Sequence, residues 1–316
     1  MSKNYYIIPV FISHQGCPHQ CVFCNQDRIA GVYDEVTAED VRERIDSYLD
    51  TMNTKNSTIE VSFFGGTFTA IPVIKQKELL AVAREYKNKG LIHKIRLSTR
   101  PDAINGYILS YLKEFKVDII ELGVQSLDDN VLRLAGRGHS AYDVENASRL
   151  IKAEGFTLGH QIMPGLPGDT KEIDLATIKK SIEMKPDIAR IYPALVIKDT
   201  PMETMYNRGE YEPYSLDMAV EVSREMLKLY NAAKVKVIRI GLQPTDTIAE
   251  GKDVVAGPFH PAFRELVEGS LICENIKEKT NESSDIIIEI NSKDISKLYC
   301  NKKQYFNAVS YTHLRA

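Results

Sequence analysis

Three cysteines, Cys17, Cys21 and Cys24, lie within the eight residues CPHQCVFC near the start of the chain. Thiolates at such short spacing bind soft metal ions and iron–sulfur clusters. A structural zinc site needs four ligands, usually from two separated pairs. His14 or His19 could complete a tetrahedron, but no second CxxC follows. The pattern therefore favours an iron–sulfur cluster, one of whose four irons is left without a protein ligand, over zinc or a purely structural cysteine group.

The other two cysteines, Cys273 and Cys300, stand alone, and we expect both to be inert. Five unevenly placed cysteines are not typical of a secreted disulfide framework. The N-terminal sequence MSKNYYIIPVFIS lacks the cleavage site of a signal peptide. No apolar run reaches the roughly 18 residues that a membrane span requires. We therefore expect a cytoplasmic protein that does not enter a membrane and whose clustered thiols are reduced.

The composition is that of an ordinary globular protein. The chain has 316 residues, of which 43% are hydrophobic, and a formal net charge of −3. This is enough apolar material for a large core. A nearly neutral chain has no general electrostatic attraction for nucleic acid, although a local basic patch could still provide one.

Apolar runs of strand length alternate with helical patterns, which is typical of repeated βα units around a parallel sheet. Thr37 and Asp40 form the pattern of a capping box at the start of one helix. Six such units predict an α/β fold, a partial (βα)6 TIM-type barrel that does not close with eight units. The expected strands are residues 5–12, 59–64, 95–99, 117–124, 156–163 and 188–192.

The chain beyond the barrel is expected to form a small C-terminal α+β extension. It contains a strand at 235–240, then an irregular stretch, a strand at 285–290 and a helix at 295–299. We therefore divide the chain into a barrel of residues 1–234 and an extension of residues 235–308. The last residues, VSYTHLRA (309–316), resemble the translation of a sequencing adapter and are expected to be a non-native tail.

Unusual polar and glycine-rich motifs follow the ends of the six predicted barrel strands. The carboxyl ends of strands in such a barrel open into one mouth, where ligands bind. The motifs are CPHQCVFC, GGT (65–67), TRPD (99–102), GVQS (123–126), MPGLPG (163–168) and YP (192–193). Because a binding module without turnover needs only the cysteines, six motifs around one mouth favour an enzyme.

The CxxxCxxC motif after the first strand resembles the signature of the radical S-adenosylmethionine (SAM) superfamily. The resemblance implies that Cys17, Cys21 and Cys24 hold a [4Fe-4S] cluster, and that SAM chelates the fourth iron. One electron from the reduced cluster then cleaves SAM to methionine and a 5′-deoxyadenosyl radical, which abstracts hydrogen from a substrate. It also implies an external electron donor of the flavodoxin or ferredoxin type.

The same resemblance assigns further positions to the binding of SAM or substrate. The expected contacts are Phe23, Gly65, Gly66, Thr67, Arg100, Gln125, Met163 and Gly165. Thr67 stands where the family usually has an acid, so the hydrogen bond of that acid stays open. The plainer alternatives are a tight turn at the glycines, a salt bridge of Arg100 to a loop carboxylate, internal hydrogen bonds of Gln125 and a proline–glycine turn.

Five motifs in chain order are similar to the radical-SAM half of the Elongator catalytic subunit. They are STRPD, ELGVQS, RGH, MPGLPGD and RIYPALVIKDTPM. This similarity favours RNA, tRNA in particular, as the substrate. RIGLQPTDTI (239–248) stands in place of a more basic tRNA-binding segment, and the extension is too short for an acetyltransferase domain. A small molecule such as a tetrapyrrole, as in oxygen-independent coproporphyrinogen oxidases, is the alternative substrate.

Overall fold

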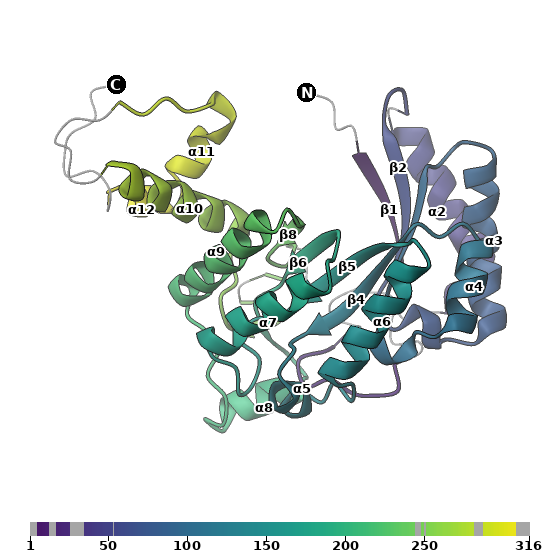
Figure 1. Ribbon diagram of the computed structural model, residues 1–316, viewed down its shortest axis with the longest axis horizontal. Helices are drawn as coiled ribbons and strands as arrows, with labels where there is room; N and C mark the ends of the chain where they lie inside the picture. The colour runs from purple at the N-terminus through teal and green to yellow at the C-terminus, as the bar shows by residue number, and fades with distance from the viewer. Residues whose placement is uncertain are drawn as a thin grey trace.

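The computed structural model describes residues 5–12, 17–25, 35–52, 54–243, 248–249, 251–280 and 287–307. Its centre is a parallel seven-stranded sheet of order β1-β2-β3-β4-β5-β6-β8, curled into a half-barrel (Figure 1). The strands are β1 (Tyr5–Phe11), β2 (Thr58–Phe64), β3 (Lys94–Thr99), β4 (Ile119–Gln125), β5 (Thr157–Ile162), β6 (Ile188–Ile191) and β8 (Lys236–Ile240). All six expected barrel strands are present, so the α/β half-barrel is confirmed.

Helices cover one face of this sheet, and Figure 1 shows short helices at the edge where the strands end. The covering helices are α2 (Ala38–Thr51), α3 (Val73–Asn88), α4 (Gly106–Glu114), α6 (Ala141–Ala153), α7 (Lys171–Glu183) and α9 (Leu216–Ala232). The short helices are α5 (Asp129–Leu134) and α8 (Pro201–Asn207). The expected capping box is confirmed, because the Thr37 side chain accepts from the Asp40 amide and Asp40 accepts from the Thr37 amide.

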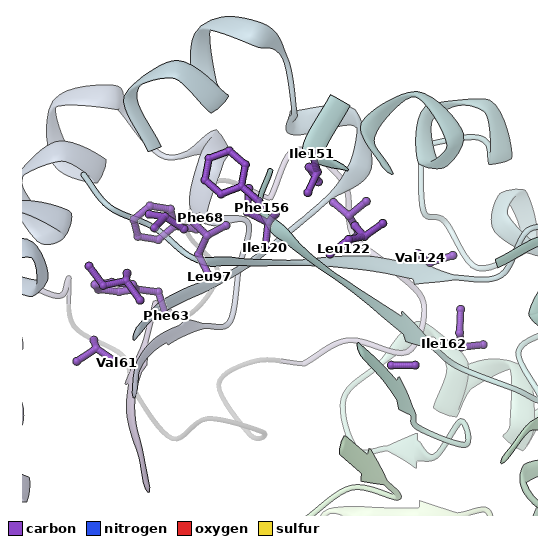
Figure 2. Packing of buried hydrophobic residues seen from close by; sticks show 14 of the residues in the cluster. Val61, Phe63, Phe68, Leu97, Ile120, Leu122, Val124, Ile151, Phe156 and Ile162 are labelled. Carbon is purple, nitrogen blue, oxygen red and sulfur yellow. The ribbon is translucent and has the colours of Figure 1, made fainter. Parts of the chain in front are cut away.

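The main core lies between the sheet and the covering helices. Figure 2 shows strand side chains such as Val61, Leu97 and Leu122 packed in one buried layer with Phe156 and with Ile151 of α6. Successive side chains of a strand point to opposite faces of the sheet. The apolar set is thus directed toward the helices, and the alternate residues are left to line the concave face.

The concave face carries a ladder of alternating charges, formed by Glu60, Arg96, Glu121 and Arg190 on β2, β3, β4 and β6. Arg96 donates to Glu60 Oε2 at 3.0 Å and to Glu121 Oε2 at 2.9 Å. Arg190 Nε donates to Glu121 Oε1 at 2.6 Å. Glu121 reaches Arg190 across β5 over Gly159, its register partner on β5, where a Cβ would lie 2.6 Å from Glu121 Cγ. The four charges cancel, so the buried face needs no outside counter-ion.

The part of the chain after residue 234 differs from the expectation in three ways. The strand assigned to the extension, β8, pairs in parallel with β6 and completes the main sheet. Two short strands, β7 (Val196–Ile197) and β9 (Val254–Ala256), form a separate antiparallel pair. An unexpected long helix, α10 (Phe263–Thr280), follows, and its residues Phe263, Leu266 and Val267 enter the main core.

The strand expected at 285–290 is wrong in its described part, residues 287–290, which has no strand pairing. Ile287 is 94% exposed, while Ile288 and Ile290 pack beside α10 with α11 (Ile295–Leu298) and α12 (Gln304–Asn307). Ile288 and Ile290 therefore cover a helix instead of joining a sheet. The expected tail at 309–316 lies outside the described residues. Within the described part of the chain, no helix is long and apolar enough to span a membrane.

The ladder generates a stability prediction for the substitution Arg96→Met. Removing the guanidinium, which is 4% exposed, leaves two buried carboxylates without their shared partner. Loss of one member of a buried ion pair costs about 3–5 kcal/mol. We expect the free energy of unfolding, measured by urea denaturation, to fall by that amount. The control Arg149→Met, on the exposed face of α6, should cost under about 0.5 kcal/mol; equal losses in the two variants would contradict the ladder's role.

Candidate active site at the carboxyl ends of the strands

Residues 17–25, here named the cysteine loop, lie at the edge of the sheet where the strands end. Backbone hydrogen bonds hold the loop from two sides. The Val22 amide donates to the carbonyl of Ala135, after α5, at 3.0 Å. The Met202 amide of α8 donates to the carbonyl of Val22 at 2.8 Å. The middle of the loop is thereby fixed between α5 and α8.

The turn after β2 approaches the loop from a third side. Gly65 and Gly66 have φ angles of +78° and +53°, which glycine adopts without strain. A Cβ at Gly65 would lie 3.3 Å from the carbonyl oxygen of Ile12, at the end of β1. Thr67 is fully buried, and its Oγ1 lies 3.3 Å from Cys17 Sγ. The predicted glycine motif and the first cysteine therefore meet, and Thr67 makes the contact.

A segment that the sequence analysis did not assign to the site, residues 135–138, packs along the cysteine loop. Gly136 and Gly138 have φ angles of +65° and +69°. A Cβ at Gly136 would lie 3.0 Å from the carbonyl oxygen of Gln20, and a Cβ at Gly138 would lie 2.4 Å from the His19 ring. The two glycines thus allow this segment to lie directly against the loop.

Arg137, between these glycines, contacts a cysteine directly. Its Nη1 donates to Cys21 Sγ at 3.2 Å and its Nη2 donates to the carbonyl of Gly123 at 2.7 Å. Arg100 donates to the Arg137 carbonyl and forms a two-point ion pair with Asp102, with both N–O distances 2.9 Å. Arg100 is therefore engaged by its own loop, as the salt-bridge alternative anticipated. A contact of Arg100 with SAM stays a prediction.

Gln125 ends β4 in a left-handed conformation, with φ of +66°, at an irregularity in the pairing with β5. Such backbone strain in a residue other than glycine gathers at functional sites. The Gln125 carbonyl accepts from the Met163 amide at 2.9 Å, and its side-chain oxygen lies 3.5 Å from Gln161 Nε2. A Cβ at Gly123 would lie 3.1 Å from Gln125 Nε2. The side chain is thus positioned beside Gly123, which also accepts from Arg137.

The two apolar residues expected to bind SAM or substrate lie in one cluster. Phe23 and Met163 are half-buried and pack against the same group of buried side chains. The members of that group are Val131, Ala135, Leu166, Ala194, Val196, Met202 and Tyr211. Gly165, with φ of +80°, faces the Tyr214 ring, and its carbonyl accepts from the Tyr211 hydroxyl at 2.6 Å. The structure therefore brings Phe23, Met163 and Gly165 into one region.

Two buried histidines lie near these elements, and the sequence analysis assigned chemistry to neither. Burial, with the nearby charges of Arg137 and Arg100, lowers the pKa of His139 to about 3. Burial alone lowers the pKa of His160 to about 3, and its two ring nitrogens lie 2.8 Å from Ser181 Oγ and 3.0 Å from Ser148 Oγ. Both rings are neutral at pH 7 and make hydrogen bonds within the protein interior.

The donor set of the cysteine loop fits a metal centre by its chemistry. Every cysteine has a free thiol. Among the described residues, no three His, Cys, Asp or Glu side chains are gathered at metal-binding spacing. The fit rests instead on Arg137, a guanidinium 6% exposed that faces Cys21 and has no ion pair with a described carboxylate. A buried positive charge requires a negative partner, which a metal-bound thiolate supplies. His14, a candidate zinc ligand, lies outside the described residues.

Comparison with known proteins gives a consistent result. The model of the radical SAM superfamily matches residues 11–179, and that of the radical SAM C-terminal domain matches residues 186–272. A tRNA uridine(34) acetyltransferase of Methanocaldococcus infernus is 30% identical over 255 residues, covering 68% of this chain and 48% of that relative. The human Elongator complex protein 3 is 26% identical over 268 residues, covering 71% and 49%.

A solved structure of the archaeal Methanocaldococcus infernus Elp3 with an N-terminal deletion shares the fold. Its TM-score is 0.69 at 26% identity, covering 87% of this chain and 64% of that chain. The chain spans about half the length of these two curated relatives. The similarity therefore concerns the half-barrel and its site, and the activity of the whole relatives does not follow from it.

The packing of residues 135–138 against the cysteine loop can be tested with Gly136→Ala. A left-handed conformation costs an alanine about 1–2 kcal/mol, and the new Cβ would press on the Gln20 carbonyl. We expect Cys21, 7% exposed, to react several-fold faster with a thiol reagent, as measured by mass spectrometry of its peptide. Gly90→Ala is the matched control, because Gly90 has φ of +73° and nothing within 4 Å of its Cβ position. Unchanged Cys21 reactivity in Gly136→Ala would contradict the contact.

Proposed function

This chain belongs to the radical SAM superfamily, and we propose that it binds a [4Fe-4S] cluster through Cys17, Cys21 and Cys24 to cleave SAM reductively. When bound, such a cluster supplies one electron to SAM, which yields methionine and a 5′-deoxyadenosyl radical. The observation that carries the proposal is the hydrogen bond from Arg137 to the sulfur of Cys21, which lies in a loop held at the ends of the strands. We propose an external donor of the flavodoxin or ferredoxin type for the electron.

The residues around the loop support roles in orienting SAM. Gly65 and Gly66 lack side chains at the turn that meets Cys17, so a ligand could approach their backbone closely. Phe23 and Met163 offer a half-buried apolar surface, which suits the face of an adenine ring. Gln125, at the end of β4, carries an amide that can donate and accept hydrogen bonds. These side chains would bind and orient SAM and exclude water from it.

The substrate we propose is tRNA. The support comes from the relatives whose names state a tRNA uridine acetyltransferase and an Elongator complex protein. Because the match covers about half of those proteins, only radical chemistry on tRNA is carried over, and acetyl transfer is left aside. The tetrapyrrole alternative has weaker support, since a coproporphyrinogen oxidase shares the fold at only 17% identity.

The cluster proposal predicts the behaviour of cysteine variants after anaerobic reconstitution with iron and sulfide. The wild-type protein should bind about four irons and release 5′-deoxyadenosine from SAM when dithionite is added. Replacing Cys17, Cys21 or Cys24 by alanine removes a ligand, so product should fall at least 100-fold. Cys300→Ala, outside the loop, should keep the activity. A loop variant that retains the wild-type rate, or a wild-type protein that takes up zinc and no iron, would refute the ligand assignment.

The substrate proposal predicts binding of tRNA that weakens with salt. Contacts with phosphates release counterions, so a site with several such contacts loses about 10³-fold or more in affinity between 50 and 200 mM salt. Fluorescence anisotropy with labelled tRNA measures this dependence. Single-stranded DNA of equal length is the control and should bind more weakly. Absence of tRNA binding at 50 mM salt would rule out tRNA and direct the search to small molecules.

A further inference from the structure

Arg137 is placed so that its guanidinium reaches both the cysteine loop and the end of β4. It is 6% exposed, and its nitrogens donate to Cys21 Sγ at 3.2 Å and to the Gly123 carbonyl at 2.7 Å. A Cβ at Gly123 would lie 3.2 Å from Arg137 Nη2. Glycine at that position therefore leaves the space through which the guanidinium reaches the loop.

The backbone of Arg137 is fixed as firmly as its side chain. Its amide donates to the carbonyl of Leu132 at 3.0 Å, at the end of α5. Its carbonyl accepts from Arg100, whose own guanidinium is held by the two-point pair with Asp102. The loops after β3 and after α5 are thereby joined behind Arg137. The hydrogen bond to Cys21 is thus preorganised by groups that do not touch the cysteines.

The charge of Arg137 is compensated by no carboxylate in the described part of the chain. Its side-chain acceptor there is the sulfur of Cys21. A hydrogen bond with an ionised donor or acceptor is roughly twice as strong as one between neutral groups. Cys21 as a thiolate ligand would therefore satisfy this arginine, while a neutral thiol would leave the positive charge buried without a partner.

We propose that Arg137 is a positioning residue that raises the reduction potential of the cluster bound by the cysteine loop; this inference rests on the proposed function. Reduction adds one electron, and so one negative charge, to the cluster and its thiolates. A positive charge and a donor at a ligand sulfur stabilise the more negative, reduced state more than the oxidised state. Hydrogen bonds to the sulfurs are a known determinant of cluster potential.

The test is a potentiometric titration of the reconstituted protein, followed by the EPR signal of the reduced cluster. Arg137→Met removes the charge and both hydrogen bonds, and keeps an unbranched side chain of similar length. We expect the ratio of reduced to oxidised cluster at a fixed potential to fall about tenfold, which corresponds to a shift of about 59 mV to lower potential for one electron. Arg137→Lys keeps the charge but not the fork of donors, so a smaller shift in the same direction is expected.

Arg133→Met is the matched control, because Arg133 lies on α5 four residues earlier and donates to Asn130 on the exposed surface. Its potential should equal that of the wild-type protein. If the cluster potentials of Arg137→Met and Arg137→Lys both equal that of the wild-type protein, this inference is overturned and the proposed function is left intact. If Arg137→Met fails to hold a cluster, an unshifted Arg137→Lys still overturns it. A wild-type protein without the EPR signal of a cluster overturns the proposed function, and the inference with it.

Discussion

The structure depends on a constraint of the half-barrel, namely that its concave face is buried yet must remain polar enough to serve a site. The ladder of Glu60, Arg96, Glu121 and Arg190 meets this constraint with charges that cancel along the sheet. Burial raises the pKa of the Glu121 carboxyl, but the Arg190 and Arg96 charges outweigh burial and hold that pKa below its ordinary value. Because four strands share these ion pairs, the strand ends above them are held in a fixed relation to one another.

The site is built on that fixed edge from segments far apart in the chain. The turn after β2 contacts Cys17, residues 135–138 run along the cysteine loop, and α8 hydrogen-bonds to the middle of the loop. Gly65 and Gly136, in the first two of these segments, allow backbone to lie against backbone where a side chain would intervene. The cysteines thus belong to a supported loop, whose support includes a positive charge. Radical chemistry requires such control, because the reactive species must meet its substrate and little else.

Much of the fold could be predicted, because a strand that turns one face toward the core is recorded locally in apolar residues at alternate positions. The runs at 59–64 and 95–99 became β2 and β3 in this way. The run at 285–290 misled, because isoleucines that cover a helix look the same as isoleucines in a strand. The cysteines and the glycine turn could be recognised by residue type. Arg137 belongs to the recognised RGH motif, but its contact with Cys21 could not be predicted, because the two residues are 116 positions apart and only the folded chain brings them together.

The central claim is that three thiolates from one loop hold a cluster whose remaining iron is open to SAM. Its most direct test is the EPR spectrum of the dithionite-reduced, reconstituted protein, recorded with and without SAM. Binding of SAM to the open iron changes the ligands of that iron, so the account predicts a clear change in the g values and line shape on addition of SAM, and no change with S-methyl-5′-thioadenosine, which lacks the amino acid group. A cluster spectrum that SAM leaves unaltered would contradict the account.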